Sequence, residues 1–206
     1  MTEEITIESE ETETPIEPKP RRVKRPENVL RKILVSIVGA LLFMVLDVTR
    51  WPHTAIGFFK LGLAPALAVV AVVGAARGPL TGFLTGYIGK FLSDLVLSGG
   101  IVTFTLYGFA IGFLGLVVGL GNYDLERGRS LIKLSVMSVI GLVFTALLTM
   151  AFGLFVEGVA VIVSLGFQLI PMLTVGIPTV ILLTPLLARI WQFAEFRLAK
   201  EDEPAE

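Results

Sequence analysis

Long apolar runs that few charged residues interrupt limit the folds open to this chain. Between Ile33 and Ala188 the sequence has only twelve Asp, Glu, Lys and Arg residues. Apolar runs of about 18 residues or more are typical of helices that cross the ~30 Å hydrocarbon core of a bilayer. The sequence therefore predicts an all-α integral membrane protein.

The composition excludes several classes of protein. Hydrophobic residues make up 54% of the chain and charged residues 17%, whereas a soluble domain has about 45–50% and about 25%. A soluble enzyme and a nucleic-acid binder are therefore excluded. The chain has one His and no Cys, which removes disulfides, thiolate metal sites and cysteine nucleophiles. We expect no metal site and no cofactor.

The apolar runs predict a bundle of six transmembrane helices. Their ranges are 33–49, 61–76, 79–98, 101–120, 131–153 and 167–190. The second is short and contains Pro65, so it is expected to be tilted or broken. Residues 159–166 are expected to lie outside the bilayer or to dip into its surface. Pro171, Pro178 and Pro185 recur every seven residues on one face and are expected to kink the last helix.

Charge at the chain ends sets the expected domain limits and topology. Residues 1–30 are predicted to be a disordered tail, acidic and then basic, whose basic part contacts lipid headgroups. Residues 31–192 form the predicted membrane domain, and 193–206 a second tail. Six spans place both termini on one side, and fourteen of the 17 Lys and Arg then share that side. The positive-inside rule makes it the cytoplasm, with the protein in the cell membrane.

Small residues at helical spacing predict close helix packing. Gly78, Gly82, Gly86 and Gly89 line one side of the third span, and Gly108, Gly112, Gly115 and Gly119 line the fourth. Such ridges let helix backbones approach closely in lipid. Internal packing is one interpretation, and docking of a second membrane protein is the other. Ser36-x-x-x-Ala40 in the first span is a similar smooth patch.

Two charged residues lie deep in the third span. Lys90 is about 16 Å from the cytoplasmic surface at ~1.5 Å per residue, and Asp94 follows one turn later. An ionised group at that depth is costly unless it faces a partner or a polar cavity. Lys90 and Asp94 either neutralise each other or line a substrate pocket in the outer half.

Other polar residues gather at the same depth, toward the extracytoplasmic side. Asp47, Arg50 and Trp51 end the first span, where they belong either to the interfacial belt or to a pocket. His53 stands without the further ligands that a metal site needs. The candidate substrate-binding residues are therefore Asp47, Arg50, Trp51, Lys90, Asp94, Thr103, Tyr107, Glu157 and Gln168.

The chain shows no energy source of its own. Gly89-Lys90 is followed by Phe91, and no upstream Gly completes a phosphate-binding loop. We therefore expect no ATPase activity, and no other enzyme motif is present. A protein of this kind can bind a compound but needs other subunits to drive transport.

Residues 61–120 resemble the substrate-binding S component of energy-coupling factor (ECF) transporters. The resemblance rests on Leu63-Ala64-Pro65, Gly78-Pro79, the Gly82–Gly86 pair, Gly89 through Asp94 and Ser98-Gly99-Gly100. It implies a vitamin-like micronutrient bound near the outer face, a transmembrane coupling subunit and two ATPase subunits.

The resemblance also implies a docking patch and excludes one substrate class. Ser36 and Ala40 stand where the family has an Ala-x-x-x-Ala patch that contacts the coupling subunit. The Met-His amino terminus of cobalt and nickel S components is absent, which argues against a metal substrate. Two other functions stay open: a scaffold of an envelope-assembly complex, and an autonomous secondary carrier.

Overall fold

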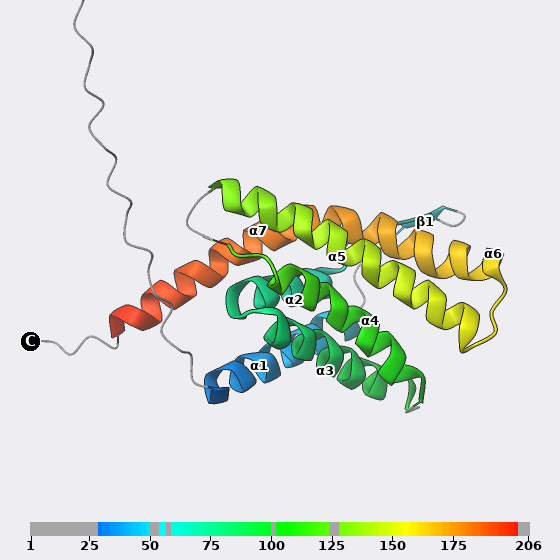
Figure 1. The fold of residues 1–206 in the computed structure, drawn as a ribbon, viewed down its shortest axis with the longest axis horizontal. Coiled ribbons are helices and arrows are strands. Elements are labelled where there is room, and N and C mark those ends of the chain that lie inside the picture. The colour runs from blue at the N-terminus through cyan, green and yellow to red at the C-terminus, as the bar shows by residue number, and fades with distance from the viewer. Residues whose placement is uncertain (1–28, 50–53, 57–58, 100–101, 124–127, 202–206) are drawn as a thin grey trace, which may run out of the picture.

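The computed structural model describes residues 29–49, 54–56, 59–99, 102–123 and 128–201, and its helices form one bundle (Figure 1). The predicted tails at 1–28 and 202–206 lie outside the described residues. The elements are α1 (Val29–Val48), β1 (Thr54–Ile56), β2 (Phe59–Leu61), α2 (Pro65–Arg77), α3 (Pro79–Ser98), α4 (Val102–Gly119), α5 (Gly128–Phe155), α6 (Val161–Ser164), the π-helix η1 (Leu165–Leu169) and α7 (Ile170–Glu201). The all-α class is confirmed, with one short antiparallel hairpin, β1–β2, added to it.

Helix α2 is the centre of the bundle. It packs against α1, α3, α4 and α7, while the pairs α3–α4, α4–α5 and α5–α7 close the structure around it. All ten residues from Pro65 to Gly74 are buried. A helix that is apolar on every side suits this position because no face of it meets water.

Helix α2 also begins inside the protein and is too short to cross a bilayer alone. Its 13 residues span about 20 Å at ~1.5 Å per residue. Pro65 at its first position has no N–H to satisfy, and the N–H of Ala64 donates to Thr179 Oγ1 at 2.9 Å. Irregular backbone is tolerated at membrane depth where protein covers it in this way. The predicted span 61–76 is thus a short buried helix, with residue 61 in β2.

Among the described residues, three helices are long and apolar enough to cross a membrane. They cover Val29–Val48, Gly128–Phe155 and Val161–Ala194. Pro65–Arg77 and Leu106–Gly119 are apolar but shorter. These helices support a membrane protein.

The last helix differs from the prediction. The chain is helical from Val161, and η1 joins α6 to α7 without a break, so residues 161–166 are not a separate segment. In η1 the N–H of Ile170 donates to the carbonyl of Leu165, five residues back. This wider turn precedes Pro171, which has no N–H to donate.

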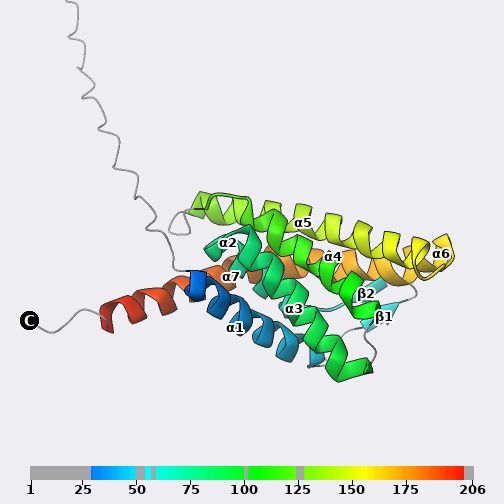
Figure 2. The same cartoon turned by 60° about the horizontal axis from the view of Figure 1, so that its bottom comes forward.

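Prolines also shape the rest of α7. Pro178 and Pro185 lie inside the helix, and Figures 1 and 2 show the red C-terminal part of α7 turned away from the orange part. The predicted domain boundary at residue 192 falls within α7, which ends only at Glu201.

The glycine ridges pack α3 directly on α4, as the internal interpretation predicted. A Cβ at Gly82 would lie 2.5 Å from the Gly115 carbonyl oxygen, and one at Gly86 would lie 2.9 Å from Gly112 Cα. No side chain fits in either space, so the two backbones meet there.

The prediction that Ser36 and Ala40 face a partner is wrong. Ser36 is 2% exposed and Ala40 is fully buried. Ser36 Oγ donates to the Lys32 carbonyl at 3.0 Å and lies 3.4 Å from the Thr81 carbonyl of α3. The small residues of α1 therefore serve the contact with α3, inside the chain.

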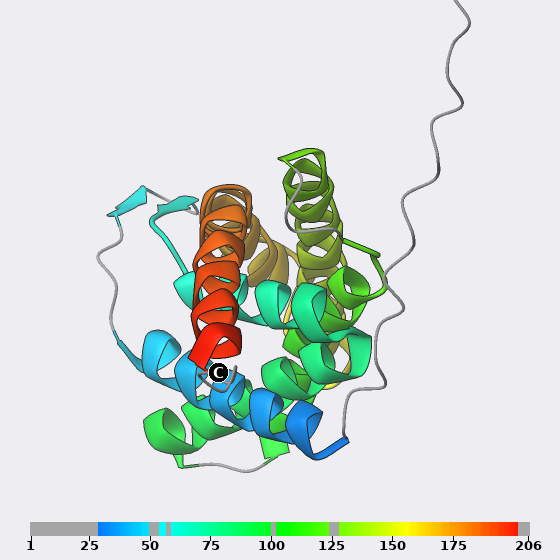
Figure 3. The ribbon, with the colours of Figure 1, turned by 90° about the vertical axis from the view of Figure 1, so that its left-hand side faces the viewer.

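The two ends of the bundle differ in charge. Figures 1 and 3 show the start of α1 and the end of α7 at the same end. We call it the basic end, because it carries Arg31, Lys32, Arg77, Arg129 and Arg189. The opposite end, next to β1 and β2, is called the hairpin end.

If the bundle crosses a membrane, the two ends of α5 lie on opposite sides. The native chain has no Cys, so single cysteines at Arg129 and Ala160 report without background. In sealed cells a membrane-impermeant thiol reagent should label Arg129→Cys only after lysis and Ala160→Cys before it. Labelling of both from one side would contradict the topology.

The glycine contact predicts a size limit at position 115. Gly115→Ala should lower the free energy of unfolding by about 1–3 kcal/mol, because its Cβ meets the Gly82 backbone. Gly128→Ala is the matched control, since a Cβ there meets nothing within 4 Å. Thermal unfolding in detergent measures both, and equal melting temperatures would argue against the contact.

Candidate ligand-binding site

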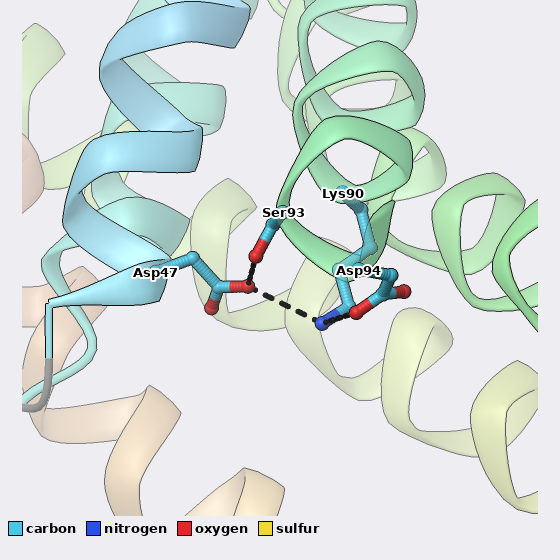
Figure 4. A network of polar contacts seen from close by, with 4 residues as sticks. All are labelled: Asp47, Lys90, Ser93 and Asp94. Carbon is cyan, nitrogen blue, oxygen red and sulfur yellow. Dashed lines mark hydrogen bonds and ion pairs between the residues drawn. The ribbon is translucent and has the colours of Figure 1, made fainter. Parts of the chain in front are cut away.

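Three charged side chains and a serine meet between α1 and α3, in the half of the bundle nearer the hairpin end. Figure 4 shows the Lys90 ammonium between two carboxylates. Lys90 Nζ lies 3.2 Å from Asp47 Oδ2 and 2.7 Å from Asp94 Oδ1. Ser93 Oγ donates to Asp47 Oδ2 at 2.5 Å. We call these four residues the Lys90 cluster.

A close helix contact positions the cluster. A Cβ at Gly89 would lie 2.9 Å from Phe43 Cβ, so α1 and α3 approach closely there. Asp47 follows Phe43 by four residues, and Ser93 follows Gly89 by four. Residues at i and i+4 share a helix face, so the glycine contact one turn earlier brings Asp47 opposite Ser93.

The charges of the cluster do not balance. Two carboxylates share one ammonium, and the side chains of Asp47, Lys90 and Asp94 are 30%, 23% and 14% exposed. The sequence analysis paired Lys90 with Asp94 alone, and the structure adds Asp47 as a second partner. Lys90 is therefore already neutralised by the protein, with one negative charge left over.

Three further predicted residues form a second group, the Tyr107 cluster, at the hairpin end. Tyr107 of α4 donates its hydroxyl to Glu157 Oε1 at 3.0 Å, and Gln168 Nε2 donates to the Tyr107 hydroxyl at 3.3 Å. Gly153 of α5 makes room for this arrangement, because a Cβ there would lie 2.8 Å from Gln168 Nε2.

The two clusters lie in the same half of the bundle, since Asp94 is near the end of α3 and Tyr107 is near the start of α4. Arg50 and Trp51 lie outside the described residues. Thr103 belongs to the first turn of α4, where the structure describes the backbone. The structure thus brings together Asp47, Lys90 and Asp94, and separately Tyr107, Glu157 and Gln168.

Sequence reasoning missed Ser93. It is fully buried and bonds to α1 across the helix interface. Its spacing of four from Gly89 was the available signal, because a residue one turn from a glycine contact also faces the neighbouring helix.

Two hollows lie elsewhere on the described part of the molecule. One of about 440 Å³ is lined by Phe83, Tyr87, Leu106, Phe109 and Phe152. The other, about 290 Å³, is an apolar groove between α1 and α7 with α2 at its base. Neither is lined by the predicted binding residues.

The charge balance predicts a specific loss. Lys90→Met should lower the free energy of unfolding by about 3–5 kcal/mol, because it leaves two carboxylates unpaired within the bundle. Neutralising Asp47 and Asp94 to Asn in the same chain should restore most of the loss. Lys32→Met, a change at an exposed lysine of the basic end, is the control and should change little. Wild-type stability of Lys90→Met in denaturant unfolding would contradict the pairing.

Comparison with known proteins gives distant relatives. The chain is 28% identical over 121 residues to a UPF0397 protein of Clostridium perfringens strain ATCC 13124, and 27% identical over 121 residues to that of strain SM101. Each match covers 59% of this chain and 63% of the relative, so the chain spans less than two thirds of these relatives. No family model matches, and no solved structure matches. The relatives' name states no activity.

Proposed function

We propose that this protein is the substrate-capture subunit of an ECF-type importer. It would bind a vitamin-like micronutrient at the hairpin end. The observation that carries the proposal is the placement of the Lys90 and Tyr107 clusters together at one end of an otherwise apolar bundle. Charged groups inside a membrane protein are costly and typically mark a substrate path.

The proposal includes an orientation. Six helices would cross the cell membrane, with the basic end in the cytoplasm and the hairpin end outside. The concentration of Lys and Arg at the basic end supports this, following the positive-inside rule. A ligand would then enter from the extracytoplasmic side.

Energy would come from partner chains, a transmembrane coupling subunit and ATPases. The groove between α1 and α7 is the best docking face for the coupling subunit. It lies in the half nearer the basic end, and its residues include Leu34, Val38, Leu42, Leu187 and Trp191.

Trp191 brings a hydrogen-bond donor, its indole N–H, to the apolar groove. The indole Nε1 is buried and has no hydrogen-bond partner among the described residues, while Arg77 lies over its ring at 5.7 Å from the centroid. A helix from the coupling subunit would fill the groove and could supply a carbonyl to this N–H. Lipid tails offer no such acceptor at that depth.

Affinity purification from native membranes tests the proposal. The tagged protein should retain coupling and ATPase subunits, detected by native mass spectrometry, and the chain purified alone should not hydrolyse ATP. Val38→Trp, which fills the groove, should reduce retention. Val136→Trp is the matched control, because Val136 is similarly exposed on α5 (53% against 58%).

Other results would favour the alternatives. Retention of envelope-assembly proteins without any ATPase would favour a scaffold. Uptake by the reconstituted chain alone, driven by an ion gradient, would favour an autonomous carrier.

A further inference from the structure

The Tyr107 cluster has a fixed direction of hydrogen bonding. An ionised carboxylate can only accept, so Tyr107 donates to Glu157. The Tyr107 oxygen then accepts from the Gln168 amide nitrogen. The Gln168 amide is thereby oriented, because its nitrogen is committed to Tyr107 and its oxygen must point elsewhere.

That oxygen meets no donor among the residues that the structure describes. Gln168 Oε1 is buried and makes no hydrogen bond within the described part of the chain. A buried acceptor left unmet is costly, and a native structure rarely keeps one without a reason. Gln168 Oε1 is therefore expected to accept a hydrogen bond from an N–H or O–H group outside the described residues.

Ser164 repeats the observation one turn earlier on the same helix. It is fully buried, and its Oγ also makes no hydrogen bond to any described residue. Ser138 and Thr145, two other buried residues, donate to the carbonyl four residues back. Ser164 does not, although it precedes Gln168 by four residues and so shares its face.

The surroundings are rich in acceptors. Among the side chains that the structure describes in this half of the bundle, Asp47 and Asp94 share the single cation Lys90, and Glu157 accepts a hydrogen bond from Tyr107. Both carboxylates of the Lys90 cluster contact Lys90, so among the described side chains the ammonium of this cluster is already paired. A compound that donates N–H groups or carries positive charge matches these groups best.

We propose that the hairpin end binds an amine-bearing compound, whose N–H group donates to Gln168 Oε1 and whose neighbouring atoms contact Ser164 Oγ. This names the substrate class of the capture site and rests on the proposed function. Glu157 contributes favourable charge for an ammonium group or a protonated amino-heterocycle.

Three ring compounds of one size test the class: benzylamine, benzyl alcohol and benzoate. Titrating each into the purified full-length chain in nanodiscs, with the melting temperature followed by tryptophan fluorescence, gives apparent affinities. We expect benzylamine to bind about tenfold more tightly than benzyl alcohol, and benzoate to give no shift. A missing shift with benzylamine, or equal affinity for the three, would overturn the proposal and leave ordered water as the partner of Gln168.

Variants test whether benzylamine binds at Ser164 and Gln168. Ser164→Ala should leave the ligand-free melting temperature unchanged or higher, because it removes an unmet hydroxyl, and should weaken benzylamine binding about tenfold. Gln168→Leu should abolish it. Ser138→Ala, which removes an equally buried but bonded serine, should leave the affinity unchanged. Undiminished benzylamine binding in Ser164→Ala would place the amine elsewhere and refute the site, even if Gln168→Leu fails to fold.

The test separates the site from the proposed function. It uses the chain without partners, so preferential amine binding with no copurifying ATPase would remove the importer role and keep the amine site. Copurification of coupling and ATPase subunits without amine preference would keep the importer role and remove the amine site.

Discussion

Helix α3 meets α4 backbone to backbone where Gly82 faces Gly115, and about two turns later it meets α1 where Gly89 packs against Phe43. In lipid, apolar side chains gain little by leaving the bilayer, so helix association depends on close packing and polar contacts. The glycines of α3 supply that packing on two sides of one helix. The position of α3 therefore sets where the other helices of the bundle pack.

The same contacts decide where charge can be kept. Lys90 follows Gly89 directly, and the close approach of α1 brings Asp47 within 3.2 Å of its ammonium. With Asp94 on the next turn, Lys90 is held by two carboxylates from two helices. A larger residue at position 89 would push α1 away and separate Asp47 from Lys90. The close packing at Gly89 thus also sets the geometry of the Lys90 cluster. An importer subunit would need both the packing and the charged groups.

The sequence predicted features that depend on local periodicity. The spacing of four between glycines indicated the close packing of α3 and α4, and the short apolar run at 61–76 indicated a short second helix. Periodicity identifies a shared face without identifying its neighbour, however. Ser36 and Ala40 form the expected smooth face of α1, yet that face meets α3 of the same chain rather than a partner.

Contacts between residues far apart in the chain were beyond local patterns. Asp47 lies 43 residues from Lys90, and Tyr107 lies 61 residues from Gln168. The depth predicted from the sequence grouped these residues as polar candidates but could not say which would touch. The π-helical turn before Pro171 was also missed, because it depends on how α6 and α7 are joined.

Two helices connect the polar end with the apolar groove. Helix α1 carries Asp47 near one end and Leu34 and Val38 of the groove near the other. The continuous helix through η1 and α7 carries Gln168 and Trp191 in the same way. A rigid shift of either helix therefore changes both places at once. If a ligand and a partner in the groove each bind one arrangement of these helices more tightly than another, each changes the affinity of the other by the same factor. Capture at one end and docking at the other would then be linked without any contact between ligand and partner.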